Sequence, residues 1–211
     1  MKLLFVTATN TNIGKTYVSL KMINHFSQQN IAVGICKPIE TGVLKEPEDA
    51  KRLLRAVQAG NPRFQDLTPR DITAYTLALP AAPFCADTQR EISIEQIKAK
   101  IASLATRCDL LIVEGAGGLM VPITKEYKMI DLMAELDAKA LLVTPSRLGC
   151  INDTLLSIEA LEHRGIDFEW VVNLYEDKES FATVTQPFYD ASFPQWQTFE
   201  AWIEGLDIGR L

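Results

Sequence analysis

The sequence predicts a single α/β domain in which a mostly parallel sheet is covered by helices on both faces. Short apolar runs alternate along the chain with segments of helical periodicity. Each apolar run is nearly continuous, which is typical of strands buried on both faces of a parallel sheet. The length of 211 residues suits one domain with a full core. We therefore expect one domain over residues 1–211, least regular at 176–211.

The strands and helices can be placed in order from these patterns. Five apolar runs predict strands at 2–8, 31–37, 109–118, 138–144 and 168–174, the third of which runs into glycines. Helical spacing predicts helices at 15–29, 46–60, 93–107 and 149–165. The helix at 93–107 opens with Ser-x-Glu-Gln, a capping signal. The aromatic residues after 176 are expected to pack on the domain.

Composition and charge exclude several classes of function. The net charge is −6, and the 21 basic residues are spread without runs, so nucleic acid is not expected as the main partner. No stretch approaches the roughly 20 apolar residues of a membrane span, so no membrane partner is expected. The N-terminal apolar run reads as a strand and not as an export signal, which predicts a cytoplasmic protein.

The cysteines and histidines give no metal or redox motif. The four cysteines are far apart, and we expect reduced core thiols in preference to a disulfide or a metal site. They are Cys36, Cys85, Cys108 and Cys150. Only two histidines occur, and His163 is placed at a helix C-terminus. A histidine-based metal site or catalytic triad is therefore not expected.

The stretch "VTATNTNIGKT", residues 6–16, joins the first strand to the first helix as a phosphate-binding loop does. Phosphates bind free backbone N–H groups at the positive end of a helix. Lys15 would add charge to the outer phosphates, and the Thr16 hydroxyl can bind Mg²⁺. The usual pattern requires Gly where Thr9 stands, but a loop one residue longer begins at Ala8. We interpret this stretch as the loop of a P-loop NTPase-like fold, in preference to an ordinary turn.

Charged residues follow other strands of the predicted sheet, where ligands of parallel sheets bind. Lys37 ends the second strand and could be a second cation over a transferring phosphoryl group. A solvated strand-end lysine is the alternative. Glu114 precedes Gly-Ala-Gly-Gly and could hold Mg²⁺. The alternative interpretation is that this segment is only a flexible turn after a core strand. Asp49 is a possible second carboxylate, but the helix dipole alone explains an acidic first turn.

A further helix N-terminus lies at Gly149, in "PSRLGCIND". The same physics makes it an anion site that could receive a substrate carboxylate. Cys150 at this position could have a lowered pKa, although a core thiol is the favoured interpretation.

Taken together, these motifs resemble the dethiobiotin synthetase family of P-loop NTPase-like enzymes. The family's G-T-D-T-x-x-G-K-T loop corresponds to "ATNTNIGKT". Its Lys-Pro segment, with a hydroxyl four residues after the Lys, corresponds to "KPIET", and its helix-starting Asp-Ala to "DA" at 49–50. "VEGAGG" and "LGCIN" match fully, and "YTLALPAAP" fits the pattern Y-x-x-x-x-P-x-x-P. The matches follow one order over residues 1–175.

The resemblance implies an activity and a set of partners. The activity is ATP-dependent carboxylation and ring closure of 7,8-diaminononanoate with CO₂, giving dethiobiotin, ADP and phosphate in biotin biosynthesis. ATP is the co-substrate and Mg²⁺ the cofactor. A homodimer is implied, because in this family the substrate carboxylate is received across a dimer interface. No protein nucleophile is needed, so positioning and positive charge would carry the catalysis.

The resemblance also implies a role for each matching residue. Lys37 and Lys15 would be catalytic by stabilising the carbamate and the transferring phosphoryl group. Mg²⁺ would be held by Thr16, Asp49 and Glu114. The nucleotide would be bound by Asn12, Ile13, Gly14, Lys15, Thr16, Tyr17, Asp49, Glu114, Gly115, Ala116, Gly117 and Asn173. The substrate would contact Thr11 and Thr41, with its carboxylate at Cys150, Ile151 and Asn152.

Some residues depart from the family pattern. Ala8 and Asn10 replace a Gly and an Asp, and Leu174 follows Asn173 where many members carry Asp to read adenine. The tail lacks the usual Gly-x-Ile-Pro, so relaxed base specificity is expected.

Two other functions are alternatives to this activity. A cobyrinate amidase-like synthetase would need a glutaminase domain, for which 211 residues leave no room. A switch ATPase of the partitioning type usually carries an extra early lysine, but only Lys2 precedes Lys15.

Overall fold

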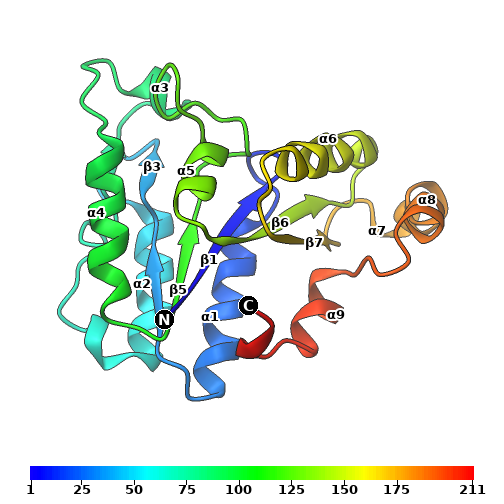
Figure 1. Cartoon of the computed structure of the whole chain (residues 1–211), viewed down its shortest axis with the longest axis horizontal. Helices are drawn as coiled ribbons and strands as arrows, with labels where there is room; N and C mark the ends of the chain where they lie inside the picture. The colour runs from blue at the N-terminus through cyan, green and yellow to red at the C-terminus, as the bar shows by residue number, and fades with distance from the viewer.

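A five-stranded parallel sheet forms the centre of the computed structural model, which describes residues 1–211 (Figure 1). The strands lie in the order β2–β5–β1–β6–β7, and every neighbouring pair is parallel. Their bounds are β1 Lys2–Ala8, β2 Val33–Cys36, β5 Leu110–Glu114, β6 Lys139–Pro145 and β7 Phe168–Asn173. The five predicted strands and the predicted fold class are confirmed.

Helices cover both faces of the sheet (Figure 1). One face carries α1 Lys15–Gln28 and α2 Glu48–Gly60. The other carries α4 Ile94–Ala105, α5 Met129–Glu135 and α6 Cys150–His163. The four predicted helices are present, with ends that shift by two residues at most. α5 was not predicted, because seven residues are too few to show a clear period.

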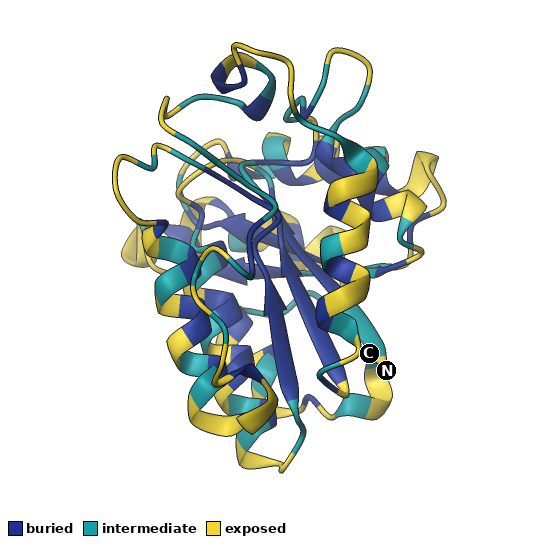
Figure 2. Ribbon diagram, turned by 90° about the vertical axis from the view of Figure 1, so that its left-hand side faces the viewer, coloured by how far each residue is buried: buried dark blue, intermediate teal, exposed yellow.

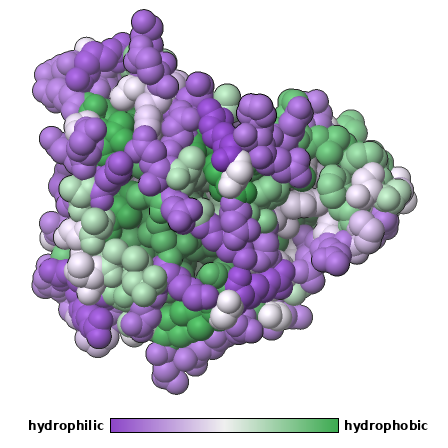
Figure 3. Space-filling view, viewed as in Figure 1, coloured by the Kyte–Doolittle hydropathy of each residue, from purple (hydrophilic) through white to green (hydrophobic).

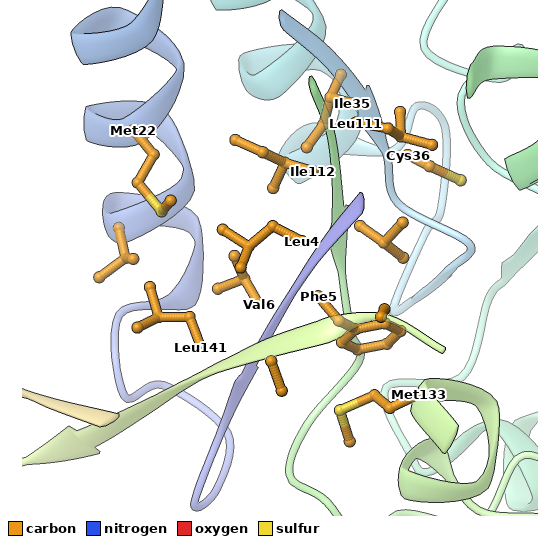
Figure 4. Close-up of a cluster of buried hydrophobic side chains, with 14 of the residues drawn as sticks. Leu4, Phe5, Val6, Met22, Ile35, Cys36, Leu111, Ile112, Met133 and Leu141 are labelled. Carbon is orange, nitrogen blue, oxygen red and sulfur yellow. The ribbon is translucent and has the colours of Figure 1, made fainter. Parts of the chain in front are cut away.

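The core explains why the strand sequences are continuous apolar runs. Leu4 and Val6 point toward α1, where Met22 lies, and Phe5 points to the opposite face beside Met133 of α5 (Figure 4). Both faces of the strand are therefore buried, and the sheet is dark blue along its length in Figure 2. An alternating polar pattern would leave polar side chains under one layer of helices, at a high desolvation cost.

A second, two-stranded parallel sheet lies beyond the end of β2. It pairs β3 Ile39–Thr41 with β4 Tyr75–Leu77, and the short α3 Pro83–Ala86 follows. The N–H groups of Ala74 and Tyr75 both donate to the Pro38 carbonyl, at 2.9 and 3.0 Å. These elements were not predicted, because three or four residues carry no periodic signal. β3 and residues 80–83, which lead into α3, form one wall of the pocket described below.

The C-terminal tail packs on the domain, as expected. Its helices are α7 Lys178–Val184, α8 Gln186–Ser192 and α9 Phe199–Glu204, followed by a short 3₁₀ turn at Ile208–Arg210. A second 3₁₀ turn, at Pro62–Phe64, follows α2 elsewhere in the chain. Phe199 and Trp202 of α9 are buried in the main core. The Lys2 ammonium donates to the carbonyls of Gly209 and Leu211, at 3.1 and 3.2 Å. The two ends of the chain therefore lie close together (Figure 1).

The prediction for the cysteines is wrong at one position. Cys36, Cys108 and Cys150 are buried thiols, but Cys85 is exposed. The reason is that Cys85 lies on α3, a single turn outside the main layers of the fold.

No helix has the length and apolar character needed to cross a bilayer.

Candidate active site

A pocket of about 1020 Å³ opens beyond the carboxyl ends of β1 and β2. Most of the predicted site residues line it together: Thr11, Asn12, Gly14, Lys15, Thr16, Tyr17, Lys37, Thr41, Asp49, Ala116, Gly117 and Asn173. Glu114 lies fully buried and contacts two of them. The N-terminus of α6, with Cys150, Ile151 and Asn152, contributes nothing to the lining of this pocket. Cys150 is a core thiol, as favoured from the sequence.

Two left-handed residues shape the phosphate loop. Asn12 has φ 62° and Gly14 has φ 98°. A Cβ atom on Gly14 would lie 2.1 Å from Nδ2 of Asn173, so glycine is required there by both conformation and space. Ala8 instead pairs with Val143 as the last residue of β1, and its φ is not positive. The chain therefore turns after Ala8, and no glycine is needed at that position.

The backbone N–H groups from Asn12 to Tyr17 donate no hydrogen bond within the protein. The neighbouring carbonyls are held from the far end of the chain. Nδ2 of Asn173 donates to the Ile13 carbonyl at 2.8 Å, and the Tyr175 hydroxyl donates to the Asn12 carbonyl at 2.6 Å. These free donors lie at the N-terminus of α1, where the helix dipole favours negative charge. The loop is thus built to receive an anion.

A buried ion pair lies beneath the loop. Oε1 of Glu114 accepts from Nζ of Lys37 at 2.8 Å and from the Thr16 hydroxyl at 2.9 Å. Lys37 also donates to the Gly115 carbonyl at 3.2 Å and is only 5% exposed. Burial alone would raise the pKa of Glu114, but the Lys37 ammonium holds it below its ordinary value. Burial opposes the charge on Lys37 too, yet Glu114 raises its pKa above the ordinary value.

Lys15 has a different electrostatic environment from Lys37. Its Nζ donates only to the Asn10 carbonyl, at 3.2 Å. Burial, and then repulsion from Lys37, lowers the pKa of Lys15 to about 8. Lys15 and Lys37 therefore both face the pocket, and of these two only Lys37 has a carboxylate partner. A polyanion in the pocket would relieve this repulsion.

The oxygen atoms around Thr16 fit a magnesium ion. Oε2 of Glu114 is buried and has no hydrogen-bond partner, and the Thr16 hydroxyl contacts the other oxygen of the same carboxylate. Asp49 lines the pocket as well. Hydroxyl and carboxylate oxygens are the ligands Mg²⁺ prefers. No group of three or more histidine, cysteine or acidic side chains is arranged to hold a metal ion by itself.

Several residues of the pocket had no signal in the sequence. They are Glu40, Arg52, Tyr175, Lys178 and Glu200. Glu40 falls inside the matched "KPIET" segment, but the family pattern fixes no residue type at that position, so the match does not single it out. Tyr175 follows Asn173 by two residues. Glu200 comes from α9, and its Oε1 accepts from the Tyr17 hydroxyl at 3.4 Å. No sequence rule places the tail beside the first helix.

Comparison with known proteins agrees with this geometry. A family model described as "AAA domain" matches residues 2–187. ATP-dependent dethiobiotin synthetase BioD from Sulfurovum sp. is 58% identical, with 93% of each chain covered. The chain belongs to the dethiobiotin synthetase family. The family's protein from Wolinella succinogenes is 38% identical over 90% of this chain and 88% of its own, and that from Methanococcus vannielii is 34% identical over 93% and 88%.

Solved structures of distant sequence share the fold of this chain. A plasmid partition protein from Borrelia burgdorferi superposes with a TM-score of 0.55 at 8% identity, over 96% of each chain. The MinC:MinD cell division complex of Aquifex aeolicus gives 0.54 at 15% identity, over 90% of this chain and 76% of that one. At these identities the likeness concerns the fold alone.

Proposed function

We propose that this chain is an ATP-dependent ligase that closes the ureido ring of dethiobiotin from 7,8-diaminononanoate and CO₂. The observation that carries the proposal is the phosphate loop, whose free N–H groups lie beside Lys15 and the Lys37–Glu114–Thr16 contacts. The name of relatives up to 58% identical supports the same activity. The site offers no nucleophile–histidine pair, and the proposed reaction needs none.

The first step forms a carbamate. One substrate amine adds to CO₂ through its nitrogen, and a proton leaves to solvent. The resulting carbamate is an anion close to a polyphosphate, so it needs positive charge nearby. Lys37 supplies that charge from a fixed position, because Glu114 and the Gly115 carbonyl hold its Nζ. Thr11 and Thr41 line the pocket and would contact the diamine.

The second step transfers the γ-phosphoryl group of ATP to a carbamate oxygen and releases ADP. The N–H groups from Asn12 to Tyr17 would hold the phosphates, and Lys15 and Lys37 would stabilise the charge on the transferring group. Thr16, Glu114 and Asp49 would hold Mg²⁺, which neutralises phosphate charge when bound. Gly115, Ala116 and Gly117 would let the backbone approach the nucleotide.

The third step closes the ring. The second amine attacks the carbonyl carbon of the mixed carbamic–phosphoric anhydride. A C–N bond forms, the C–O bond to phosphate breaks, and inorganic phosphate and a proton leave. The role of the protein here is to hold the two ends of the reacting group together and to exclude water from the anhydride.

A homodimer is part of the proposal. Apolar surface gathers toward the end of the molecule where α6 and α8 lie (Figure 3). Leu148 and Leu156, before and on α6, are 74% and 59% exposed. A dimer through α6 would bury them and could bring the Cys150–Asn152 backbone to the substrate carboxylate of the partner. Sedimentation of the wild type and of Leu156→Glu would test this, and a monomeric wild type would contradict it.

A cytoplasmic location stays a prediction.

We also propose weak selection of the nucleotide base. Nδ2 of Asn173 is already used by the Ile13 carbonyl, which leaves the side chain less able to read a base. The nearby aromatic rings belong to Tyr17 and Tyr175, and stacking on an aromatic ring accepts any base.

The deciding experiment measures phosphate release with Mg·ATP and bicarbonate, with and without 7,8-diaminononanoate. We expect release that depends on the diamine, with one dethiobiotin formed per phosphate. Equal release without the diamine would contradict the ligase and favour a switch ATPase.

A further inference from the structure

Glu40 is a buried carboxylate that the proposed reaction leaves without a role. It is the middle residue of β3, opposite Thr76 of β4, and is only 8% exposed. Lys37 precedes it by three residues, and Thr41 follows it directly; all three line the pocket. A charged side chain is rarely retained in such a position unless it is fully partnered.

Both oxygens of Glu40 have a partner, and both partners belong to one helix end. Oε1 accepts from the N–H of Asp49 at 3.0 Å, and Oε2 accepts from the N–H of Ala50 at 2.9 Å. These are orphan donors in the first turn of α2, which need a cap from outside the helix. The preceding residue is Pro47, which makes no side-chain cap. The cap for α2 is therefore supplied by β3, nine residues before Asp49.

The same contact fixes the backbone that carries Asp49. The Asp49 side chain lines the pocket together with Lys15, Thr16 and Lys37. Two hydrogen bonds from consecutive N–H groups to one carboxylate leave the helix end little freedom to rotate or slide against β3. The contact also occupies N–H groups that would otherwise attract phosphate, so α1 stays the helix whose N-terminus offers free donors to the pocket.

We propose that Glu40 is a positioning residue that sets the Asp49 carboxylate in the magnesium and phosphoryl site by capping α2 from β3. The proposal rests on the proposed function, since it takes Asp49 as a Mg²⁺ ligand. Glu40 acts through Asp49, because both of its carboxylate oxygens are engaged by N–H groups of α2. Removing residues that orient a metal ligand typically weakens metal binding or activity about 10–100-fold.

The test compares wild type, Glu40→Gln, Glu40→Ala, Asp49→Asn and the double variant E40Q/D49N. We expect Glu40→Gln to raise the Mg²⁺ concentration for half-maximal activity about tenfold and Glu40→Ala somewhat more. ATP affinity in the presence of EDTA should stay within about twofold, because the α1 loop is untouched. In the Asp49→Asn background, Glu40→Gln should add almost nothing. Glu46→Gln is the matched control, since Glu46 pairs with Lys51 on the surface beside α2.

A second readout uses the free protein. Hydrogen exchange of the segment 47–54 should speed up in Glu40→Ala, while the sheet strands stay protected. Full additivity of Glu40→Gln with Asp49→Asn would overturn the proposal, because Glu40 would then act independently of Asp49. An unchanged Mg²⁺ requirement in Glu40→Gln or in Asp49→Asn would overturn it as well.

The two proposals fail in different ways. A wild type without diamine-dependent phosphate release would contradict the proposed function. Nucleotide affinity measured with Mg²⁺ and with EDTA would still decide the role of Glu40. If Glu40→Gln and Asp49→Asn reduce the gain in affinity that Mg²⁺ gives by the same factor, the role of Glu40 is supported. If Glu40→Gln leaves that gain unchanged, the role is overturned.

Discussion

The pocket has two ends that are built differently. At the phosphate end, Lys37 and Glu114 are buried and form hydrogen bonds, and the loop backbone is braced by Asn173. At the other end, Tyr17 and Tyr175 are 42% and 44% exposed, and Glu200 makes one long hydrogen bond. Charge recognition is therefore organised before the ligand arrives, whereas base recognition is not. We therefore expect affinity and chemistry to depend mainly on the first end, and the second end to tolerate variation.

Loss of the Lys37 charge should give the largest effect and test the claim for the phosphate end. We expect Lys37→Met to lower kcat about 10³-fold, as removal of a preorganised transition-state donor does. ATP affinity should change little, because Lys37 lies outside the loop. Single-turnover phosphate release and ATP binding would measure the two effects separately.

The matched control for that variant is Lys15→Met. It should weaken ATP binding strongly, because Lys15 lies in the loop itself. Lys37→Met also leaves Glu114 buried without its cation, so K37M/E114Q should recover part of the lost stability. Equal loss of ATP affinity in both lysine variants would show that the role of Lys37 is misassigned.

A methyl group on Gly14 should disturb the loop more than any change at the base end. Gly14→Ala forces a left-handed alanine, which costs about 1–2 kcal/mol, and it places Cβ against Asn173. We expect lower thermal stability and ATP binding weakened about tenfold or more. Adding Asn173→Ala should relieve the clash but not the backbone cost. Wild-type affinity in Gly14→Ala would contradict the loop geometry.

The lowered pKa of Lys15 gives a pH effect of intermediate size. Bound triphosphate favours the ammonium form, so it raises the pKa of Lys15 from about 8 in the free protein. Affinity for the triphosphate is then highest below pH 8. It falls as the pH rises past 8, by up to about tenfold per pH unit. Titration calorimetry in buffers of different ionisation enthalpy should also show proton uptake on binding near pH 8. A flat affinity between pH 7.5 and 9.5, or proton release, would contradict this.

The smallest effects should come from the base end. Rates with ATP, GTP and CTP should agree within about fivefold, because aromatic stacking tolerates any base. Glu200→Gln should change these ratios only slightly. A strong preference for ATP would refute the comparison, since it would require a reader of adenine in the exposed half of the pocket.

The two ends also differ in how well the sequence predicted them. The loop, Lys37 and Glu114 lie at the ends of strands that show as continuous apolar runs, and parallel strands bring such ends together. Asp49 lies in the first turn of α2, a helix with clear periodicity. Glu40 could not be found, because β3 is three residues long and its partners are backbone N–H groups that any sequence possesses. Tyr175 and Glu200 could not be found either, since their places depend on tail packing. The expected base contact of Asn173 stays a prediction, although its amide already holds the loop.

The place of β1 in the sheet has a consequence for synthesis. The strand that leads into the phosphate loop pairs only with β5 and β6, so its first partner begins at residue 110. Asn173, which braces the loop at Ile13, is made 160 residues after it. On the ribosome the first strand must therefore stay unpaired until β5 has been made, and such long-range pairing is slow to form. The phosphate loop reaches its braced form only after Asn173 has been made as well.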